Sequence, residues 1–123
     1  MKILIAIGTG SFIGGVLRYL IAEYVQSKQL TTFPLGTLSV NLIGCLLIGI
    51  VYGLTEKANL TQEWRLFIAT GLLGGFTTFS AFSMETVELL RDGHFVSAAA
   101  YITLSVLLGL FCVYIGISLN KLF

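Results

Sequence analysis

Long runs without a charged residue constrain the fold of this chain more than any other feature. Residues 29–55, 66–84 and 95–120 contain no Asp, Glu, Lys or Arg. Each run is long enough to cross a hydrocarbon core of about 30 Å, which takes roughly 20 residues of helix. Residues 3–17 are also uncharged, and this run reaches spanning length if its helix continues past Arg18. With 56% hydrophobic and only 11% charged residues, the chain belongs to the membrane class.

We therefore predict an all-α membrane protein with a single four-helix transmembrane domain over residues 1–123. A signal peptide is the alternative for the segment after Lys2, but Gly14–Tyr19 continues as helix and no cleavage pattern stands out. The approximate spans are 3–25, 35–55, 62–90 and 95–120.

The basic residues are divided almost equally between the two sides of the predicted bundle. Four spans place Lys2, Lys57, Arg65 and Lys121 on one side, and Lys28, Arg91 and, if it snorkels that way, Arg18 on the other. The positive-inside rule needs a clear excess to fix an orientation. Four small helices are also few to enclose a pathway. We expect insertion in both orientations and an antiparallel dual-topology homodimer.

The segment Gly71–Ser83 interrupts the third predicted span with three glycines, two threonines and two serines, and it carries no charge. An unsatisfied backbone group in hydrocarbon costs several kcal/mol, so a break survives only where protein or a water-filled cavity covers it. Broken helices at this depth build ion and substrate sites. We predict that the third helix is broken at mid-membrane and that function lies there.

Other polar residues within the spans have two readings each. Asn41, with Thr37 one turn before it, could be interhelical glue or part of a site. Arg18 could snorkel to the interface or have a structural or electrostatic role. Tyr101 and Ser105 share a face of the fourth helix and could serve packing or line a path.

No catalytic set and no His, Cys or Asp cluster with metal-ligand spacing occurs, so an enzyme is not expected. A net charge of +1 offers no patch for nucleic acid. Three functions remain: a passive anion channel, a small multidrug-type proton-coupled cation exporter, and an assembly subunit. Proton-coupled export of this kind requires a carboxylate at mid-membrane depth in the first helix, and residues 3–17 contain none.

The intramembrane polar groups are neutral donors, which can replace the hydration shell of a small anion without holding it too tightly. The ring edges of Phe79 and Phe82 carry the positive part of the aromatic quadrupole. Carbonyls freed near Gly74 and Thr77 are hard oxygen ligands suited to a cation. A site in which carbonyl oxygens bind a cation and nearby donors bind an anion is therefore physically possible.

Three motifs of the chain resemble the Fluc (CrcB) fluoride channels over its whole length. They are Gly15–Tyr19, Gly36–Asn41 with Gly44 and Cys45, and Gly74–Ser83 with Glu85. The resemblance implies a passive fluoride channel in a bacterial or archaeal plasma membrane. It also implies an antiparallel homodimer with two pores and a structural sodium ion as cofactor.

Carried over by position, the resemblance makes Asn41 the amide of the fluoride pore and Phe79 and Phe82 its aromatic pair. It gives the sodium ion the backbone carbonyls of Gly74 and Thr77, and it matches Arg18 to an arginine of the first helix. The remaining polar lining would be Thr78, Ser80, Tyr101 and Ser105. The implied partners are fluoride, sodium, a second copy of the chain and the lipid bilayer.

Overall fold

A computed structural model describes residues 1–122, and over these residues the chain forms only helices and their connections. The first, second and fourth spans are single helices. The third is divided into four consecutive pieces, as predicted for an interrupted span. The helices are α1 (Lys2–Ser27), α2 (Leu35–Lys57), α3 (Gln62–Arg65), the π-helix η1 (Leu66–Leu73), α4 (Gly74–Phe76), α5 (Phe79–Arg91) and α6 (Phe95–Leu119).

Four helical segments are long and apolar enough to cross a membrane: Lys2–Ser27, Leu35–Lys57, Gln62–Arg91 and Phe95–Leu119. The prediction of a four-helix membrane protein is confirmed at this level. Pro34, the single proline, lies at the N-cap of α2, where its missing N–H breaks no helical bond.

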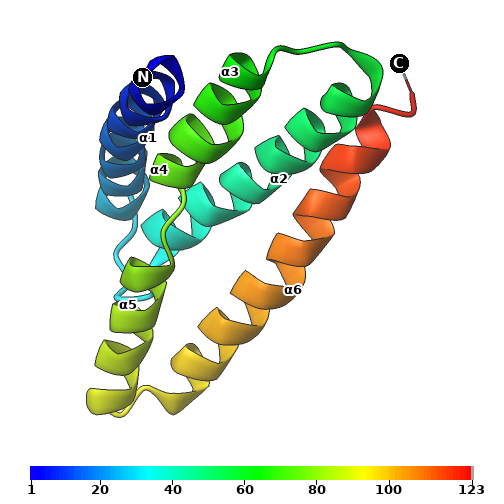
Figure 1. The fold of residues 1–123 in the computed structure, drawn as a ribbon. Coiled ribbons are helices and arrows are strands. Elements are labelled where there is room, and N and C mark those ends of the chain that lie inside the picture. The colour runs from blue at the N-terminus through cyan, green and yellow to red at the C-terminus, as the bar shows by residue number, and fades with distance from the viewer. Residues whose placement is uncertain (123) are drawn as a thin grey trace.

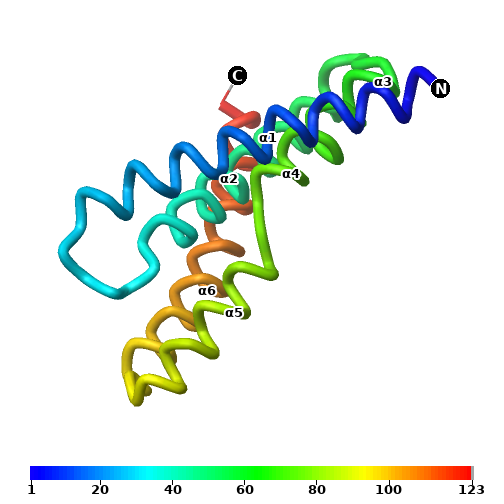
Figure 2. Tube along the Cα trace, turned by 90° about the vertical axis from the view of Figure 1, so that its left-hand side faces the viewer, coloured from blue at the N-terminus to red at the C-terminus, as the bar shows by residue number. Residues whose placement is uncertain are grey.

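Two helix pairs carry most of the packing. Figure 1 shows α1 lying along η1 and α4, and α2 running beside α6. After the break, α5 leaves the direction of α4 and descends to meet α6 at the turn that joins them, and Figure 2 shows the same bend from the side. The two termini and the α2–α3 connection lie at the opposite end of the molecule from the α5–α6 turn.

Glycines allow the backbones of α1 and the third span to touch. A Cβ on Gly10 would lie 2.8 Å from the Leu72 nitrogen, and a Cβ on Gly75 would lie 2.9 Å from the Ser11 Cα atom. A Cβ on Gly14 would overlap the Leu72 carbonyl oxygen. Small residues that let backbones approach are the usual device of membrane helix pairs. Gly10 and Gly14 therefore lie on the face of α1 that packs against the third span, whereas Gly8 and Gly15 take no part in it.

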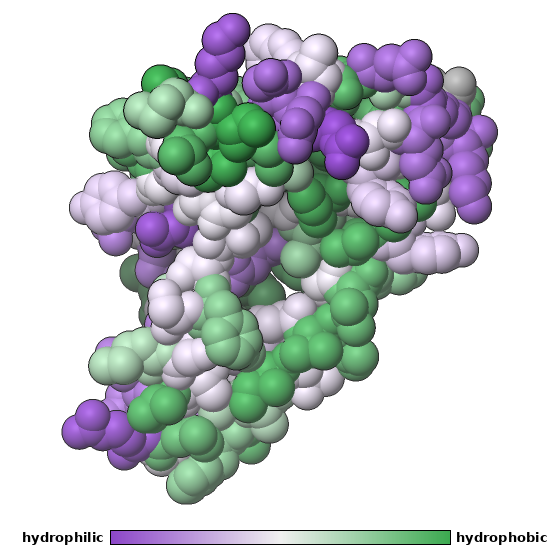
Figure 3. Space-filling model, in the orientation of Figure 1, coloured by the Kyte–Doolittle hydropathy of each residue, from purple (hydrophilic) through white to green (hydrophobic). Residues whose placement is uncertain are grey.

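The surface is apolar along the spans and hydrophilic at the ends of the molecule, with hydrophobic residues covering the outer side of α6 (Figure 3). One small cluster of buried residues consists of Leu38, Leu89, Ala98 and Tyr101, with Phe33, Leu35, Leu42 and Phe82 packed against it. Large apolar side chains therefore face outward, as expected of a chain surrounded by lipid or by a second protein surface.

Candidate functional site

The helix break between α4 and α5 is only two residues long. Thr77 (φ −87°, ψ 156°) and Thr78 (φ −149°, ψ 118°) are both extended. The helix begins again at Phe79 and runs to Arg91. The two threonines therefore change the direction of the chain without a loop.

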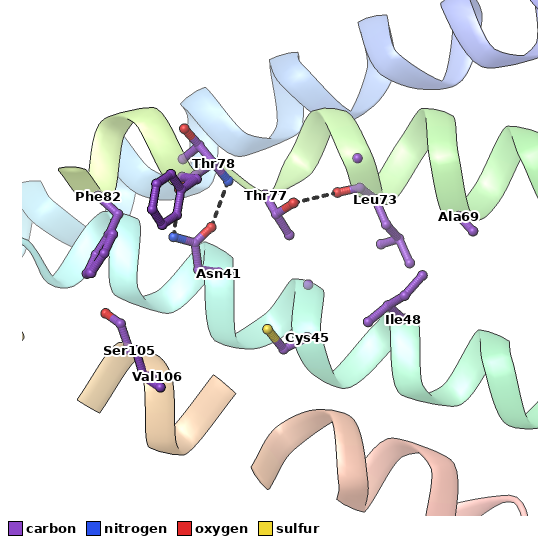
Figure 4. Close-up of a pocket in the computed structure, with 13 residues that line it drawn as sticks. Asn41, Cys45, Ile48, Ala69, Leu73, Thr77, Thr78, Phe82, Ser105 and Val106 are labelled. Carbon is purple, nitrogen blue, oxygen red and sulfur yellow. Dashed lines mark hydrogen bonds between the residues drawn. The ribbon is translucent and has the colours of Figure 1, made fainter. Parts of the chain in front are cut away.

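Asn41 of α2 replaces the hydrogen bonds that the break removes. Its side-chain Nδ2 donates to the Thr78 carbonyl at 3.0 Å, and its Oδ1 accepts from the Thr78 backbone N–H at 2.8 Å (Figure 4). In a continuous helix that N–H would donate to the carbonyl four residues earlier, which is the Gly74 carbonyl. The amide of Asn41 thus satisfies Thr78 and releases the Gly74 oxygen.

The side chain of Thr78 replaces a second hydrogen bond of the interrupted helix. Its hydroxyl is the N-cap of α5 and accepts from the Ala81 backbone N–H at 3.2 Å. That N–H is the donor that a continuous helix would give to the Thr77 carbonyl. Two side-chain bonds therefore free the carbonyl oxygens of Gly74 and Thr77, the pair that the sequence assigned to a cation.

A cavity of about 400 Å³ adjoins the break and collects most of the predicted site residues. Asn41, Thr78, Phe82 and Ser105 lie around it on three different spans (Figure 4). All of its lining residues are uncharged. They are Asn41, Gly44, Cys45, Ile48, Ala69, Leu73, Gly74, Thr77, Thr78, Phe79, Phe82, Ser105 and Val106.

Ser105 is the polar group of this lining whose bonding is incomplete. Its hydroxyl oxygen is buried, and within residues 1–122 it has no hydrogen-bond partner. Buried polar atoms are normally paired, so an orphan hydroxyl beside a cavity points to an absent ligand or water. The sequence left open whether Ser105 served packing or a path, and its unpaired hydroxyl favours a path.

Three aromatic rings run from the break into the core. The Phe79 and Phe82 ring centroids are 5.7 Å apart, and the Phe82 and Tyr101 centroids are 5.0 Å apart. Phe79 is 78% exposed, whereas Tyr101 is fully buried. The expected proximity of Phe79 and Phe82 is therefore present, and Tyr101 extends their row.

Glu85 is a central residue for which the sequence predicted no role beyond its place beside the third motif. Its Oε1 accepts from the Thr37 hydroxyl at 2.5 Å, and its Oε2 accepts from the Tyr101 hydroxyl at 2.9 Å. One carboxylate thus joins α2, α5 and α6. The available signal was its spacing, because a residue three positions after Phe82 shares that residue's helix face.

Two further predicted residues lie at the edge of the site. Arg18 donates from Nε to the Gly75 carbonyl at 3.2 Å, so its side chain contacts the third span directly beside the break. Ser80 is exposed, and its hydroxyl lies 3.3 Å from that of Thr78. Ser80 does not line the cavity at the break.

The π-helix η1 is another feature that the sequence argument missed. It covers Leu66–Leu73 and ends where the Gly74 N–H donates to the Ala69 carbonyl, five residues back. Such segments are rare and are often found at functional sites. Here the wider turn precedes the break, and it presents Gly71 to the backbone of α1.

Comparison with known proteins finds relatives that match nearly the whole chain. The family described as CrcB-like protein, Camphor Resistance (CrcB), matches residues 5–117. A protein of Phocaeicola vulgatus named fluoride-specific ion channel FluC is 44% identical over 121 residues, covering 98% of this chain and all of that one. The protein of the same name from Flavobacterium psychrophilum is 43% identical, with 98% of each chain covered. That from Shewanella oneidensis is 40% identical, with 94% of each covered. The chain belongs to the CrcB family.

Proposed function

We propose that this chain is a passive fluoride channel of the bacterial plasma membrane, working as an antiparallel dual-topology homodimer. The observation that carries the proposal is the uncharged cavity at the break, where an amide, hydroxyls and aromatic rings converge. The relatives are named fluoride-specific ion channels and match nearly the whole chain. In this proposal the break lies at mid-membrane depth.

The anion path would run along the aromatic row and the neutral donors. The Ser105 hydroxyl has no partner within residues 1–122 and is free to donate to an anion. The ring edges of Phe79 and Phe82 offer positive partial charge. The first turn of α5 adds the positive end of a helix dipole at the same place. The proposed pore residues are Asn41, Thr78, Phe79, Ser80, Phe82, Tyr101 and Ser105.

A sodium ion is the cofactor that this arrangement would accept. The carbonyl oxygens of Gly74 and Thr77 lose their helical partners to Asn41 and Thr78, and oxygen ligands of this kind suit a hard cation. When bound, the ion would supply fixed positive charge beside an anion path. Arg18 would support the site from the other side by holding the Gly75 carbonyl away from it.

The dimer is proposed because the site is open on the protomer. Gly74 is exposed, and Phe79 is 78% exposed although it lines the cavity. A second copy packed against this face would cover the cavity and bring a second pair of carbonyls to the cation. Antiparallel packing fits the nearly equal division of basic residues between the two sides.

Efflux from proteoliposomes tests the function. Vesicles loaded with potassium fluoride or potassium chloride and containing the purified protein should release fluoride when valinomycin is added, and retain chloride. An ion-selective electrode measures both. Chloride leaving as fast as fluoride, or fluoride retained as in empty vesicles, would overturn the proposal.

The alternative is a proton-coupled cation exporter, and Glu85 is the observation that favours it, because it is a carboxylate within the bundle. That function would appear as uptake of a cationic dye driven by a pH gradient, with no valinomycin-dependent fluoride release. A fluoride channel should transport no dye under the same gradient.

A further inference from the structure

A second, more polar cavity is lined in part by Glu85, which does not line the cavity at the break. It has a volume of about 300 Å³, and Glu23, Gln26, Thr32, Thr37 and Glu85 are among its lining residues. Thr37 and Glu85 belong both to this cavity and to the bonded group that holds Tyr101. We call it the entrance cavity, because under the proposed function Glu85 links it to the aromatic row through the Tyr101 hydroxyl.

The side-chain amide of Gln26, near the end of α1, makes three hydrogen bonds beside this cavity. Its Nε2 donates to the Thr31 carbonyl at 3.2 Å and to the Phe33 carbonyl at 3.1 Å. Its Oε1 accepts from the Gly36 backbone N–H at 3.0 Å. One side chain therefore binds the connection before Pro34 and the first turn of α2 after it.

The bond to Gly36 supplies a cap that α2 lacks. The N-cap of α2 is Pro34, which makes no side-chain cap hydrogen bond. The first N–H groups of a helix need a partner from outside the helix. Gln26 provides one from α1, and the close approach of the Gly36 Cα to the Ala22 backbone fixes the same junction.

Residues 33–37, which Gln26 holds in place, carry the groups that orient Glu85. Thr37 follows Gly36 directly and donates to Glu85. Phe33 packs edge-on against Tyr101, with centroids 5.6 Å apart and planes at 75°, and Tyr101 donates to the other oxygen of Glu85. A shift of residues 33–37 would therefore move both partners of this carboxylate.

We propose that Gln26 is a positioning residue for ion conduction. It fixes the first turn of α2 and Phe33 so that Thr37 and Tyr101 hold Glu85 at the entrance cavity. This inference rests on the proposed function, since it assigns Gln26 a part in the same path.

The test compares Gln26→Met with Gln29→Met in the fluoride efflux assay. Gln26→Met keeps the length of the side chain and removes all three hydrogen bonds. Gln29 is exposed, and within residues 1–122 its side chain makes no hydrogen bond, so Gln29→Met is the matched control. We expect Gln26→Met to slow fluoride efflux about tenfold and Gln29→Met to leave it unchanged.

A double variant separates positioning from a general loss of structure. If Gln26 acts through Thr37, the variant that combines Gln26→Met with Thr37→Val should be no slower than the slower of the two single variants. Independent effects would multiply instead, and that result would overturn the inference. Should Gln26→Met fail to fold, Gln26→Asn keeps the amide but is one carbon too short to reach all three partners, and the same slowing is expected.

Amide hydrogen exchange gives a readout that does not depend on transport. Residues 33–37 should exchange faster in Gln26→Met than in the unsubstituted protein, while α6 stays protected. Unchanged exchange and unchanged efflux would refute the inference and leave the proposed function standing. Absence of fluoride efflux from the unsubstituted protein would refute the proposed function itself.

Discussion

At the residue scale, the side chain of Asn41 makes two hydrogen bonds to the Thr78 backbone. Substitutions can remove these bonds with or without adding a charge. Asn41→Asp keeps the acceptor for the Thr78 N–H but loses the donor to the Thr78 carbonyl, and it adds a negative charge to an uncharged cavity. Two like charges about 4 Å apart repel by about 4 kcal/mol at an effective dielectric constant of 20. Fluoride efflux should fall about a thousandfold.

Asn41→Leu is the control for this prediction. It removes both bonds without adding charge, so it measures what the capping of Thr78 alone contributes. We expect Asn41→Leu to form less folded dimer on size exclusion, because two buried backbone groups lose their partner. Efflux at the unsubstituted rate from Asn41→Asp would remove Asn41 from the proposed pore.

Single residues were predictable from the sequence where their type conflicts with a membrane span. An amide at position 41 and an arginine at position 18 are out of place in an apolar helix, and the structure puts both in contact with the residues of the break. Glu85 and Gln26 gave no such signal. Glu85 directly follows the uncharged run 66–84, and Gln26 lies between Glu23 and Lys28. Polar side chains at such positions usually face water, and only the path of the chain turns these two inward.

At the scale of helices, α1 and the third span are in close backbone contact just before the break. A Cβ on Gly14 would overlap the Leu72 carbonyl oxygen and lie 2.9 Å from the Phe76 nitrogen, whereas a Cβ on Gly15 or Gly8 meets nothing within 4 Å. Gly14→Ala should therefore push α4 away from α1. We expect a loss of about 1–3 kcal/mol, the usual cost of overpacking, seen as a lower Tm in detergent.

Gly15→Ala and Gly8→Ala are matched controls on the same helix, and alanine is the better helix former. Both should leave Tm unchanged or raise it slightly. An equal loss of stability in Gly14→Ala and Gly15→Ala would mean that α1 does not pack as described.

The helices themselves followed from hydropathy, because lipid requires each span to satisfy its own backbone. The break followed from composition, since glycines and hydroxyl residues at 71–83 cannot form an ordinary span. The π-helix could not be predicted from the sequence, because Leu66–Leu73 has the composition of a regular apolar helix. Its wider turn packs against α1, and no local pattern encodes such a tertiary contact.

At the scale of the whole molecule, the proposed dual topology depends on a near balance of basic residues that a few substitutions can upset. Exposed positions exist on both sides: Asn59 and Gln62 near the α2–α3 connection, and Gln29 and His94 in the connections at the other side. Asn59→Lys with Gln62→Lys should force the first side to face the cytoplasm, and Gln29→Lys with His94→Lys should force the second.

Neither double variant should form an antiparallel dimer alone, because all of its copies insert the same way. Each should therefore lose fluoride efflux when expressed by itself, and C-terminal reporter fusions should report one orientation only. Expressing both together supplies both orientations, so efflux should return. The unsubstituted chain should report both orientations from the same fusions. Full efflux from either variant alone would mean that copies facing one way suffice, and that the cavity at the break is closed by something other than an inverted second copy.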